Sequence, residues 1–303
     1  SNSRAWRFHH GKQPSDHQQI REDCFSMAAR MSSLLLIMAF CGLFGHSLGS
    51  LPGDPRMIEL TWRLENGMAH WPGMVPYNFT IVDRGMIPDG FYLELNNIYL
   101  AEHTGTHLDA PAHFIQGAWR LDQVPLQNLA GPGVVVDVRD KTRDNPDYEI
   151  GPQDFQDWER EHGRIPDGSV LMLRTGWGEW YWDQGETAYL GTDDGNTSLL
   201  HFPGLHPDGA QWLADNRKMH VIGIDTGSMD YGQSVQKMSH QILLPKRVVF
   251  IENVGHLDQL PITGSTVYAM PILIGEGSGG PARVFAIVDD RTSACSLTTS
   301  TVV

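Results

Sequence analysis

The chain of 303 residues carries 22 basic and 36 acidic side chains, which gives a formal net charge of −14, and 41% of its residues are hydrophobic. This length predicts one large or two small domains with a substantial core. The acidic balance disfavours nucleic acid and anionic membranes as partners.

The first fifty residues have the layout of a secretory signal peptide that follows an upstream segment. Residues 1–26 show no apolar periodicity, and we interpret them as translated upstream sequence. Arg30 then precedes an apolar run over 34–44, and small residues follow as far as Gly49. Because this run is shorter than the roughly 20 residues that span a bilayer, we predict cleavage after Gly49 and an extracellular protein without membrane attachment. A membrane anchor or a buried helix is the alternative.

Secretion would determine which residues belong to the mature protein and which modifications it can carry. We predict three parts, which are an upstream segment plus signal peptide over 1–50, one folded domain over 51–291 and a flexible tail over 292–303. Only Cys295 remains after cleavage, so no intramolecular disulfide can form. Asn78 and Asn196 each begin an Asn-x-Ser/Thr triplet, and we expect both to be glycosylated in a secreted protein.

The folded domain begins with a predicted strand over 57–64 and a turn near Gly67. Trp71 follows, beside the rigid turn formed by Pro72 and Gly73. An aromatic side chain at this place either packs in the core or lies beside a ligand, and the residues alone leave both interpretations open. A second predicted strand, 91–100, leads into a histidine-rich stretch.

This stretch holds four polar side chains at odd-numbered positions: His103, His107, Asp109 and His113. In an extended backbone, side chains alternate between two faces, so we expect all four to point to the same side. Gly105 shares that face and would leave room between two of the histidines. Imidazoles and a carboxylate that converge on one point are the ligand set of Zn²⁺, Mn²⁺ or Fe²⁺. The alternative is a surface loop with scattered histidines.

Strands and helices alternate through the rest of the chain. We predict strands over 134–138, 170–175, 221–224, 248–252 and 284–288, and helices over 153–161 and 207–216. The aromatic segment 177–182 either packs in the core or forms a substrate wall or a subunit contact. Gly275, Gly277 and Gly280 satisfy a dinucleotide-binding spacing, but this loop joins two predicted strands and opens no helix, so we reject that site.

One segment has the local pattern of an aspartic protease. Asp225-Thr226-Gly227-Ser228 follows a short apolar strand, as in that class of enzyme. The protease mechanism needs two carboxylates that share a proton, and the chain has no second Asp-Thr-Gly. A protease would therefore have to be a homodimer, which we regard as a minor alternative.

The pattern H-x-G-T-H-x-D-x-P-x-H-F, from His103 to Phe114, resembles the signature of the cyclase-like metal hydrolase family, to which bacterial kynurenine formamidase and isatin hydrolase belong. The resemblance covers roughly residues 57–290. Gly223, Asp225, Ser228 and Asp230 match a second stretch of the family. It implies an α/β fold, a single-domain swivelling β/β/α arrangement with a β-barrel-like core. It also implies a homo-oligomer, a dimer or a tetramer, in which the partner chain helps to close the pocket.

The resemblance also implies how the site residues would be used. A first metal ion would be held by His103, His107, Asp109 and Glu252. A second would be held by His240 together with the same two carboxylates, which would bridge the ions. We expect Zn²⁺ first and Mn²⁺ second. His113 would donate and accept protons, and Trp71 would line the substrate pocket.

The expected activity is that of a metal-dependent hydrolase acting on C–N bonds other than peptide bonds. The most specific expectation is an arylformamidase of tryptophan catabolism, which converts N-formyl-L-kynurenine and water to L-kynurenine and formate. The alternatives are an isatin-type or other cyclic-amide hydrolase, and a secreted protein that binds a small aromatic molecule and has lost turnover.

Overall fold

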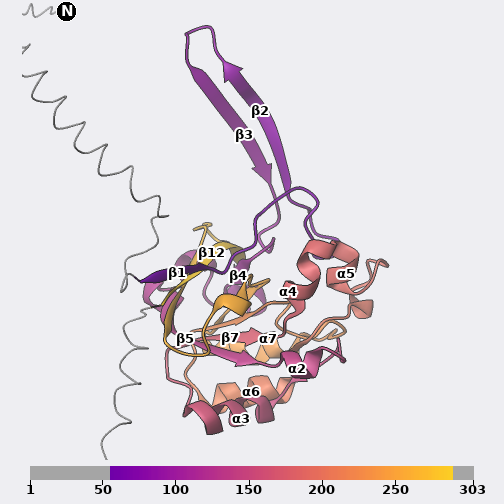
Figure 1. Cartoon of the computed structure of the whole chain (residues 1–303), viewed down its shortest axis with the longest axis vertical. Helices are drawn as coiled ribbons and strands as arrows, with labels where there is room; N and C mark the ends of the chain where they lie inside the picture. The colour runs from indigo at the N-terminus through magenta and orange to yellow at the C-terminus, as the bar shows by residue number, and fades with distance from the viewer. Residues whose placement is uncertain (1–54, 289–303) are drawn as a thin grey trace, which may run out of the picture. The chain divides into compact units, whose positions relative to one another are not determined.

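Seven strands close into a ring in the computed structural model, which describes residues 55–288 (Figure 1). In ring order they are β12 (Gly279–Val288), β11 (Ser265–Pro271), β5 (Ala130–Asp137), β7 (Val170–Arg174), β9 (Val221–Ile224), β10 (Val249–Glu252) and β4 (His107–Asp109). The ring closes because β4 pairs with both β10 and β12. Outside the ring, β1 (Arg56–Glu59) pairs with the far half of β12. The predicted α/β fold with a barrel-like core is confirmed.

The middle of the ring is a parallel sheet of β5, β7, β9 and β10. Strands of this kind are covered on both faces, which explains why β7, β9 and β10 are buried throughout. Alternate residues enter two different cores. Val135 and Met172 pack inside the ring, whereas Val134 and Leu171 pack towards the helices on the outside.

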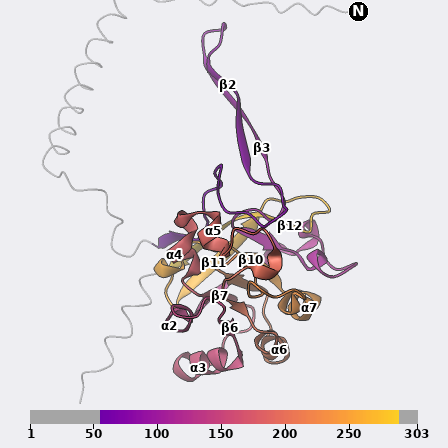
Figure 2. The ribbon, with the colours of Figure 1, turned by 90° about the vertical axis from the view of Figure 1, so that its right-hand side faces the viewer.

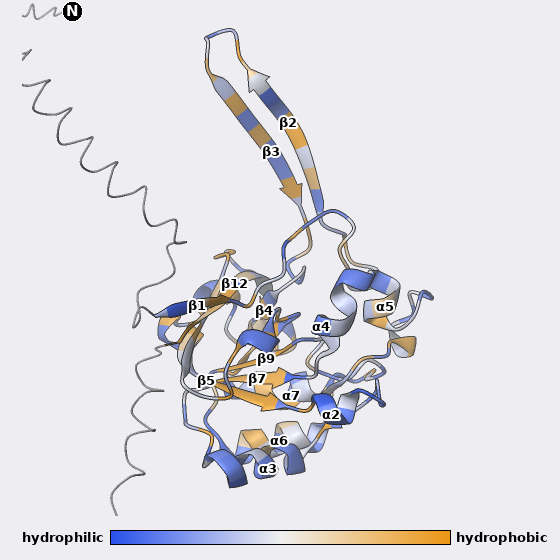
Figure 3. Cartoon of the chain, in the orientation of Figure 1, coloured by the Kyte–Doolittle hydropathy of each residue, from blue (hydrophilic) through white to orange (hydrophobic). Residues whose placement is uncertain are grey.

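Helices α3 (Pro152–His162), α6 (Pro207–Asn216) and α7 (Met238–Leu243) pack over the parallel strands (Figure 2). Their apolar faces meet the sheet and their polar faces point outward, as the hydropathy colouring shows (Figure 3). Phe155 of α3 and Leu213 of α6 are fully buried in that contact. Shorter elements complete the fold: α2 (Arg139–Thr142), α4 (Trp177–Tyr181), α5 (Glu186–Leu190), β6 (Glu149–Ile150) and β8 (Gly204–Leu205).

A long hairpin of β2 (Asn78–Met86) and β3 (Tyr92–Tyr99) extends away from the ring in both views (Figures 1 and 2). Its two strands pair only with each other, with a bulge at Val82. Almost every residue of the hairpin is exposed, including large apolar side chains.

Several predicted elements coincide with the structure, and others differ. The helix over 207–216 and the strand over 221–224 have the predicted bounds. The first strand ends at Glu59 instead of residue 64. Neither β2 nor β11 was expected, nor was the short helix α7 that contains His240.

Some expectations concern residues outside the described range 55–288. The upstream segment and signal peptide, the tail from 292 and Cys295 belong to this group. Among residues 55–288, no helix has both the length and the apolar character needed to cross a bilayer.

Candidate metal centre

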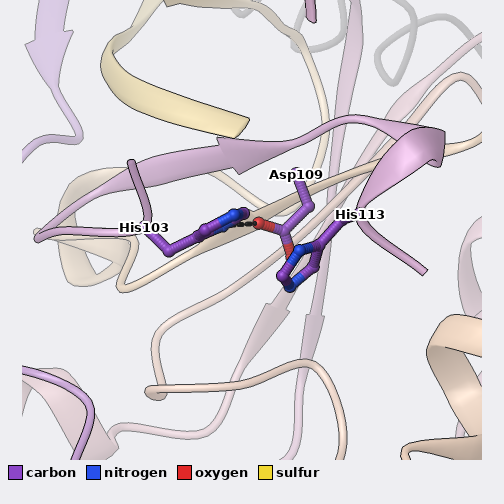
Figure 4. Close-up of side chains that lie close together, drawn as sticks. All are labelled: His103, Asp109 and His113. Atoms are coloured by element: carbon purple, nitrogen blue, oxygen red, sulfur yellow. Dashed lines mark hydrogen bonds and ion pairs between the residues drawn. The ribbon is translucent and has the colours of Figure 1, made fainter. Parts of the chain in front are cut away.

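Six predicted side chains meet where β4 lies beside β10. Glu252 is paired with His107 in the ladder, and Asp109 is paired with Phe250. The stretch from His103 to His113 is not extended throughout, so the shared face expected for an extended backbone does not apply. Only His107–Asp109 is a strand, since His103 lies in the turn before it and His113 ends the 3-10 helix η1 (Pro111–His113). The chain bends back at both ends of β4, so the imidazoles of His103 and His113 stack with centroids 3.9 Å apart (Figure 4).

Two glycines shape the surroundings of the centre, and only one was expected. Gly105 has a φ of +62°, and a Cβ there would lie 2.7 Å from Leu64 Cδ2, so it serves the turn and its packing instead of leaving room for a metal ion. Gly279 makes room for the centre. A Cβ at that position would lie 2.4 Å from Cε1 of His103.

Asp109 and Glu252 each present their two oxygens to different histidines. Oδ1 of Asp109 lies 3.3 Å from Nε2 of His107, and Oδ2 lies 3.4 Å from Nε2 of His240. Oε2 of Glu252 lies 3.5 Å from Nε2 of His107, and Oε1 lies 3.3 Å from Nε2 of His240. Both carboxylates therefore lie between the two imidazoles, which is the placement expected of bridging ligands.

Hydrogen bonds fix the orientation of the imidazoles. Nδ1 of His107 donates to the carbonyl of Gly105 at 2.8 Å, which leaves Nε2 with a free lone pair. Nδ1 of His240 is 2.5 Å from Oδ2 of Asp230, so its Nε2 is likewise directed at the carboxylates.

His103 is oriented by a different pair of groups. The hydroxyl of Ser278 donates to Glu102 at 2.7 Å, so its oxygen accepts from Nε2 of His103 at 3.1 Å. Nδ1 of His103 then faces Oδ1 of Asp109 at 2.6 Å.

The residues fit a divalent metal ion. Nε2 of His107 is buried and has no hydrogen-bond partner in the described structure, although Asp109 and Glu252 are close by. Two groups have ligand atoms that all lie within 4.8 Å of one another, His103–Asp109–His113 and His107–Asp109–Glu252. Imidazoles and carboxylates suit zinc and manganese. The first group also makes His113 a possible ligand, in addition to its predicted role in proton transfer.

Burial and neighbouring charges shift the pKa values of these groups in opposite directions. Burial disfavours the charged form of His107, but Asp109 and Glu252 outweigh it and raise its pKa to about 9. Burial lowers the pKa of His113 to about 4. Burial opposes ionisation of Asp109, yet the histidines around it, including the hydrogen-bonded His103 and His107, hold its pKa well below the ordinary value. The centre therefore strongly favours cations close to Asp109, whereas His113 is held neutral.

A cavity of about 260 Å³ opens above the centre. Its floor includes four of the histidines and Glu252, and Trp71 lies on its wall. Lys237 and Tyr189 line the same cavity. Trp71 is thus placed beside the centre, where the resemblance expected it.

Asp225 is not part of an aspartic protease site. It is buried, and its carboxylate accepts bonds from the backbone and hydroxyl of Thr175 at 2.9 and 2.6 Å and from the backbone of Gly176 at 2.8 Å. These bonds hold the turn between β7 and α4. Because Asp225 is buried and both of its oxygens accept these bonds, it cannot share a proton with an aspartate of a partner chain, which removes the protease interpretation.

Several supporting residues were not singled out from the sequence. Asp230 was noted only as part of a motif, and Lys237 was not noted at all. Asn253 follows Glu252 with a φ of +55°, and its side-chain nitrogen donates to the carbonyl of Gly105 at 2.8 Å. A left-handed asparagine directly after a ligand strand could have suggested such a lock. The predicted glycosylation sites Asn78 and Asn196 lie away from the cavity and are exposed.

Comparisons with known proteins agree with this geometry. The family model Cyclase, described as "Putative cyclase", matches residues 58–231. Isatin hydrolase of Roseibium aggregatum is 31% identical over 208 residues, which cover 66% of this chain and 77% of that protein. Kynurenine formamidase of Bacillus cereus is 24% identical over 226 residues, covering 75% of this chain and 94% of that protein.

Among solved structures, isatin hydrolase A from Labrenzia aggregata bound to benzyl benzoate superposes with a TM-score of 0.70 at 30% identity. The match covers 78% of this chain and 94% of that chain. The similarity therefore extends over most of the ring and its helices.

Proposed function

This chain belongs to the cyclase family of metal-dependent hydrolases, and on that premise we propose that it hydrolyses the C–N bond of a small aromatic amide. The observation that supports this most directly is the placement of Asp109 and Glu252, each with one oxygen towards His107 and one towards His240. Such a centre beneath a cavity with an aromatic wall suits an aromatic amide.

The residues of the site would have different roles in hydrolysis. A bound divalent ion supplies a usable nucleophile from water near neutral pH and polarises the carbonyl of the substrate. His113 lies on the cavity wall, stacked on His103, where it can take a proton and return it to the departing amine. Trp71 offers its indole to an aromatic substrate.

We propose two divalent ions per chain, with Zn²⁺ first and Mn²⁺ second. Elemental analysis of protein purified without chelator tests this number directly. About two equivalents per chain would support the bridging roles of Asp109 and Glu252. One equivalent would remove those roles, and the absence of metal after reconstitution would overturn the proposed function.

For the substrate we propose N-formyl-L-kynurenine, which would yield L-kynurenine and formate, with isatin-type lactam opening as the second candidate. Similarity to the kynurenine formamidases supports the first substrate, and similarity to the isatin hydrolases supports the second. A panel of formylkynurenine, isatin and simple formanilides, assayed with each metal, separates the two. Tight binding without turnover of any of them would support the third possibility, a binding protein that has lost activity.

We propose that copies of the chain associate through the hairpin of β2 and β3. One face of it presents five apolar side chains that are between 38% and 69% exposed: Phe79, Ile81, Met86, Tyr92 and Ile98. An isolated two-stranded hairpin is marginally stable in water, and exposed apolar patches are typical of interaction surfaces. Arg84 and Glu94 pair on the same face, so each copy offers both charges to the other.

Light scattering tests this association. The native protein should be a dimer or a tetramer, and Ile81→Asp should shift it to the monomer. Val235→Asp changes an apolar residue outside the hairpin that is even more exposed, 78% against 49% for Ile81, and should leave the assembly intact. A monomeric native protein would refute the proposal.

We also propose that the protein is secreted and glycosylated. The apolar run over 34–44 supports export, and the exposure of Asn78 and Asn196 leaves both sequons accessible. When the full chain is expressed in eukaryotic cells, the culture medium should contain a protein that begins near residue 50. This protein should lose mass on glycosidase treatment. Cell-retained protein with residues 1–49 intact would contradict this.

A further inference from the structure

Lys237 places a buried ammonium group on the wall of the cavity. Its Nζ is shielded from solvent and has no hydrogen-bond partner within residues 55–288. The group lies 4.7 Å from the centre of the Trp71 ring, and Lys237 lines the same cavity as the metal centre.

The nearby carboxylates already have partners. Asp230 is bound to Nδ1 of His240 at 2.5 Å and accepts from the backbone of Ser239 at 2.8 Å. Glu252 faces the two imidazoles and accepts from the backbone of Met229 at 2.7 Å. Neither carboxylate forms an ion pair with Lys237, so no ion pair compensates the charge of the ammonium group.

The backbone holds Lys237 in this position. Its φ and ψ are both 51°, in the left-handed region, at the start of α7. A lysine in that conformation costs about 1 kcal/mol or more, and such strain is found where surrounding structure imposes it. The backbone N–H of Lys237 donates to the hydroxyl of Ser234 at 3.2 Å. Because His240 lies on the same short helix, the backbone of Lys237 keeps a fixed position relative to His240.

A buried cation without a partner is costly, and an aromatic ring offsets only part of that cost. The desolvation penalty for one ion is several kcal/mol, whereas a cation–π contact returns about 0.5 to 2 kcal/mol. An anionic group on the ligand would supply the missing partner. An anion that binds Nζ of Lys237 would lie beside Trp71, because Nζ is 4.7 Å from the centre of that ring.

We propose that Lys237 binds a carboxylate carried by the substrate, on a part of the molecule remote from the amide that is cleaved. This inference rests on the proposed function and narrows its substrate class to aromatic amides with an acidic side group. Formylkynurenine has such a carboxylate and isatin does not, so the site favours the first candidate.

The test compares two ligands that differ in one group. L-Kynurenine carries the carboxylate, and kynuramine, its decarboxylated analogue, lacks it. Their affinities are measured by calorimetry on the metal-loaded and the metal-free full chain, because a carboxylate could also bind metal. We expect a preference for L-kynurenine of about 10- to 100-fold in both forms, as a charge-assisted hydrogen bond provides.

Substitution identifies the residue responsible. Lys237→Met keeps the aliphatic stem and should remove the preference by weakening only the binding of L-kynurenine. Lys237→Arg should retain it. Equal affinities of the two ligands for the native protein, or a preference that survives in the methionine variant, would overturn the inference.

The outcomes also separate this inference from the proposed function. Because binding needs no turnover, a protein that shows the preference but hydrolyses nothing would keep the role of Lys237 and lose the activity. A protein that hydrolyses neutral and acidic amides equally well would keep the activity and lose the role.

Discussion

His113 occupies a position that permits two roles, ligand or proton carrier. It stacks on His103, and its ligand atom is close enough to Asp109 to share an ion with it. Burial also keeps its imidazole neutral, as a group that accepts a proton must be. The choice between the two roles is therefore experimental.

We expect His113→Ala to keep both metal equivalents and to lower kcat by about 10²- to 10⁴-fold, the usual contribution of a general acid–base group. Metal content and turnover should be measured on the same preparation. His162→Ala, which removes an exposed histidine at the end of α3, is the control. Loss of metal from the His113 variant would reassign this residue as a ligand.

Asp225 should make stability depend on pH. Burial raises its pKa to about 6 from an ordinary 3.8, despite the bonds from Thr175 and Gly176. Between these values the carboxyl group of Asp225 keeps its proton in the folded chain and loses it in the unfolded chain. Its contribution to the free energy of unfolding is therefore full below about pH 4 and lost above about pH 6. The difference amounts to about 3 kcal/mol.

Urea denaturation of the native protein and of Asp225→Asn at several pH values measures this contribution. The free energy of unfolding of the native protein, relative to that of the variant, should fall by about 3 kcal/mol from pH 4 to pH 7. A difference between the two proteins that is constant with pH would show that the carboxylate has an ordinary pKa.

Some candidate ligands were easier to predict from the sequence than others. His103, His107, Asp109 and His113 stand close together in the chain, and their chemistry is evident from residue type alone. His240 and Glu252 came only from a family resemblance. Lys237 could not be predicted, because nothing in the sequence shows that its ammonium group is buried without a partner.

At the scale of elements, β4 is a three-residue strand between two bends. The predicted alternation assumed a longer strand, but Pro111 starts a 3-10 helix immediately afterwards. The hairpin strand β2 was missed for a related reason. Its bulge at Val82 shifts the alternation, so Phe79 and Ile81 share a face with Arg84 and not with Asp83.

The first residue of β12 should control the geometry of the centre. A methyl group at Gly279 would lie 2.4 Å from Cε1 of His103, so Gly279→Ala should displace that imidazole. We expect metal affinity to fall by about 10- to 100-fold, as when an outer contact of a ligand is lost. Competition with a chromophoric chelator measures it. Gly275→Ala, in open space in the loop before β12, is the control.

An unchanged affinity in the Gly279 variant would mean that His103 can move without loss, and would weaken its assignment as a ligand. A fall in thermal stability of both alanine variants would instead point to a general effect on the loop. The two measurements together therefore distinguish a change in ligand position from a change in folding.

For the molecule as a whole, the metal centre should also stabilise the fold. Asp109, His107, His240 and Glu252 are all buried where the ring closes. A ligand that binds only the folded state adds about 2.7 kcal/mol when its concentration is 100 times its Kd. A chelator should therefore lower Tm by several degrees, and Zn²⁺ or Mn²⁺ should restore it.

Asp109→Ala is the matched control for this experiment. It should lose metal and activity together, and its Tm should not respond to the chelator. Calorimetry on both proteins, with metal content measured in parallel, checks the expectation. Retention of two ions by the variant would exclude Asp109 as a bridging ligand.

The closed ring was expected only from the family resemblance, and the periodicity of the sequence alone did not predict it. Apolar runs over 134–138 and 221–224 indicated buried strands, and the structure contains both strands. Closure depends on β4 meeting both β10 and β12, which are far along the chain. Periodicity reports which face of an element is buried, and it contains no information about such distant partners.

The position of β4 also sets the order of events during biosynthesis. Asp109 lies 131 residues before His240, and His103 lies 175 residues before Ser278. At ribosomal rates, the histidine-rich stretch emerges on the order of ten seconds or more before those partners exist. A nascent chain thus offers imidazoles to metal ions before it can coordinate them correctly. Correct loading must wait until translation has supplied β12, so metal delivery is a late, post-translational step of maturation.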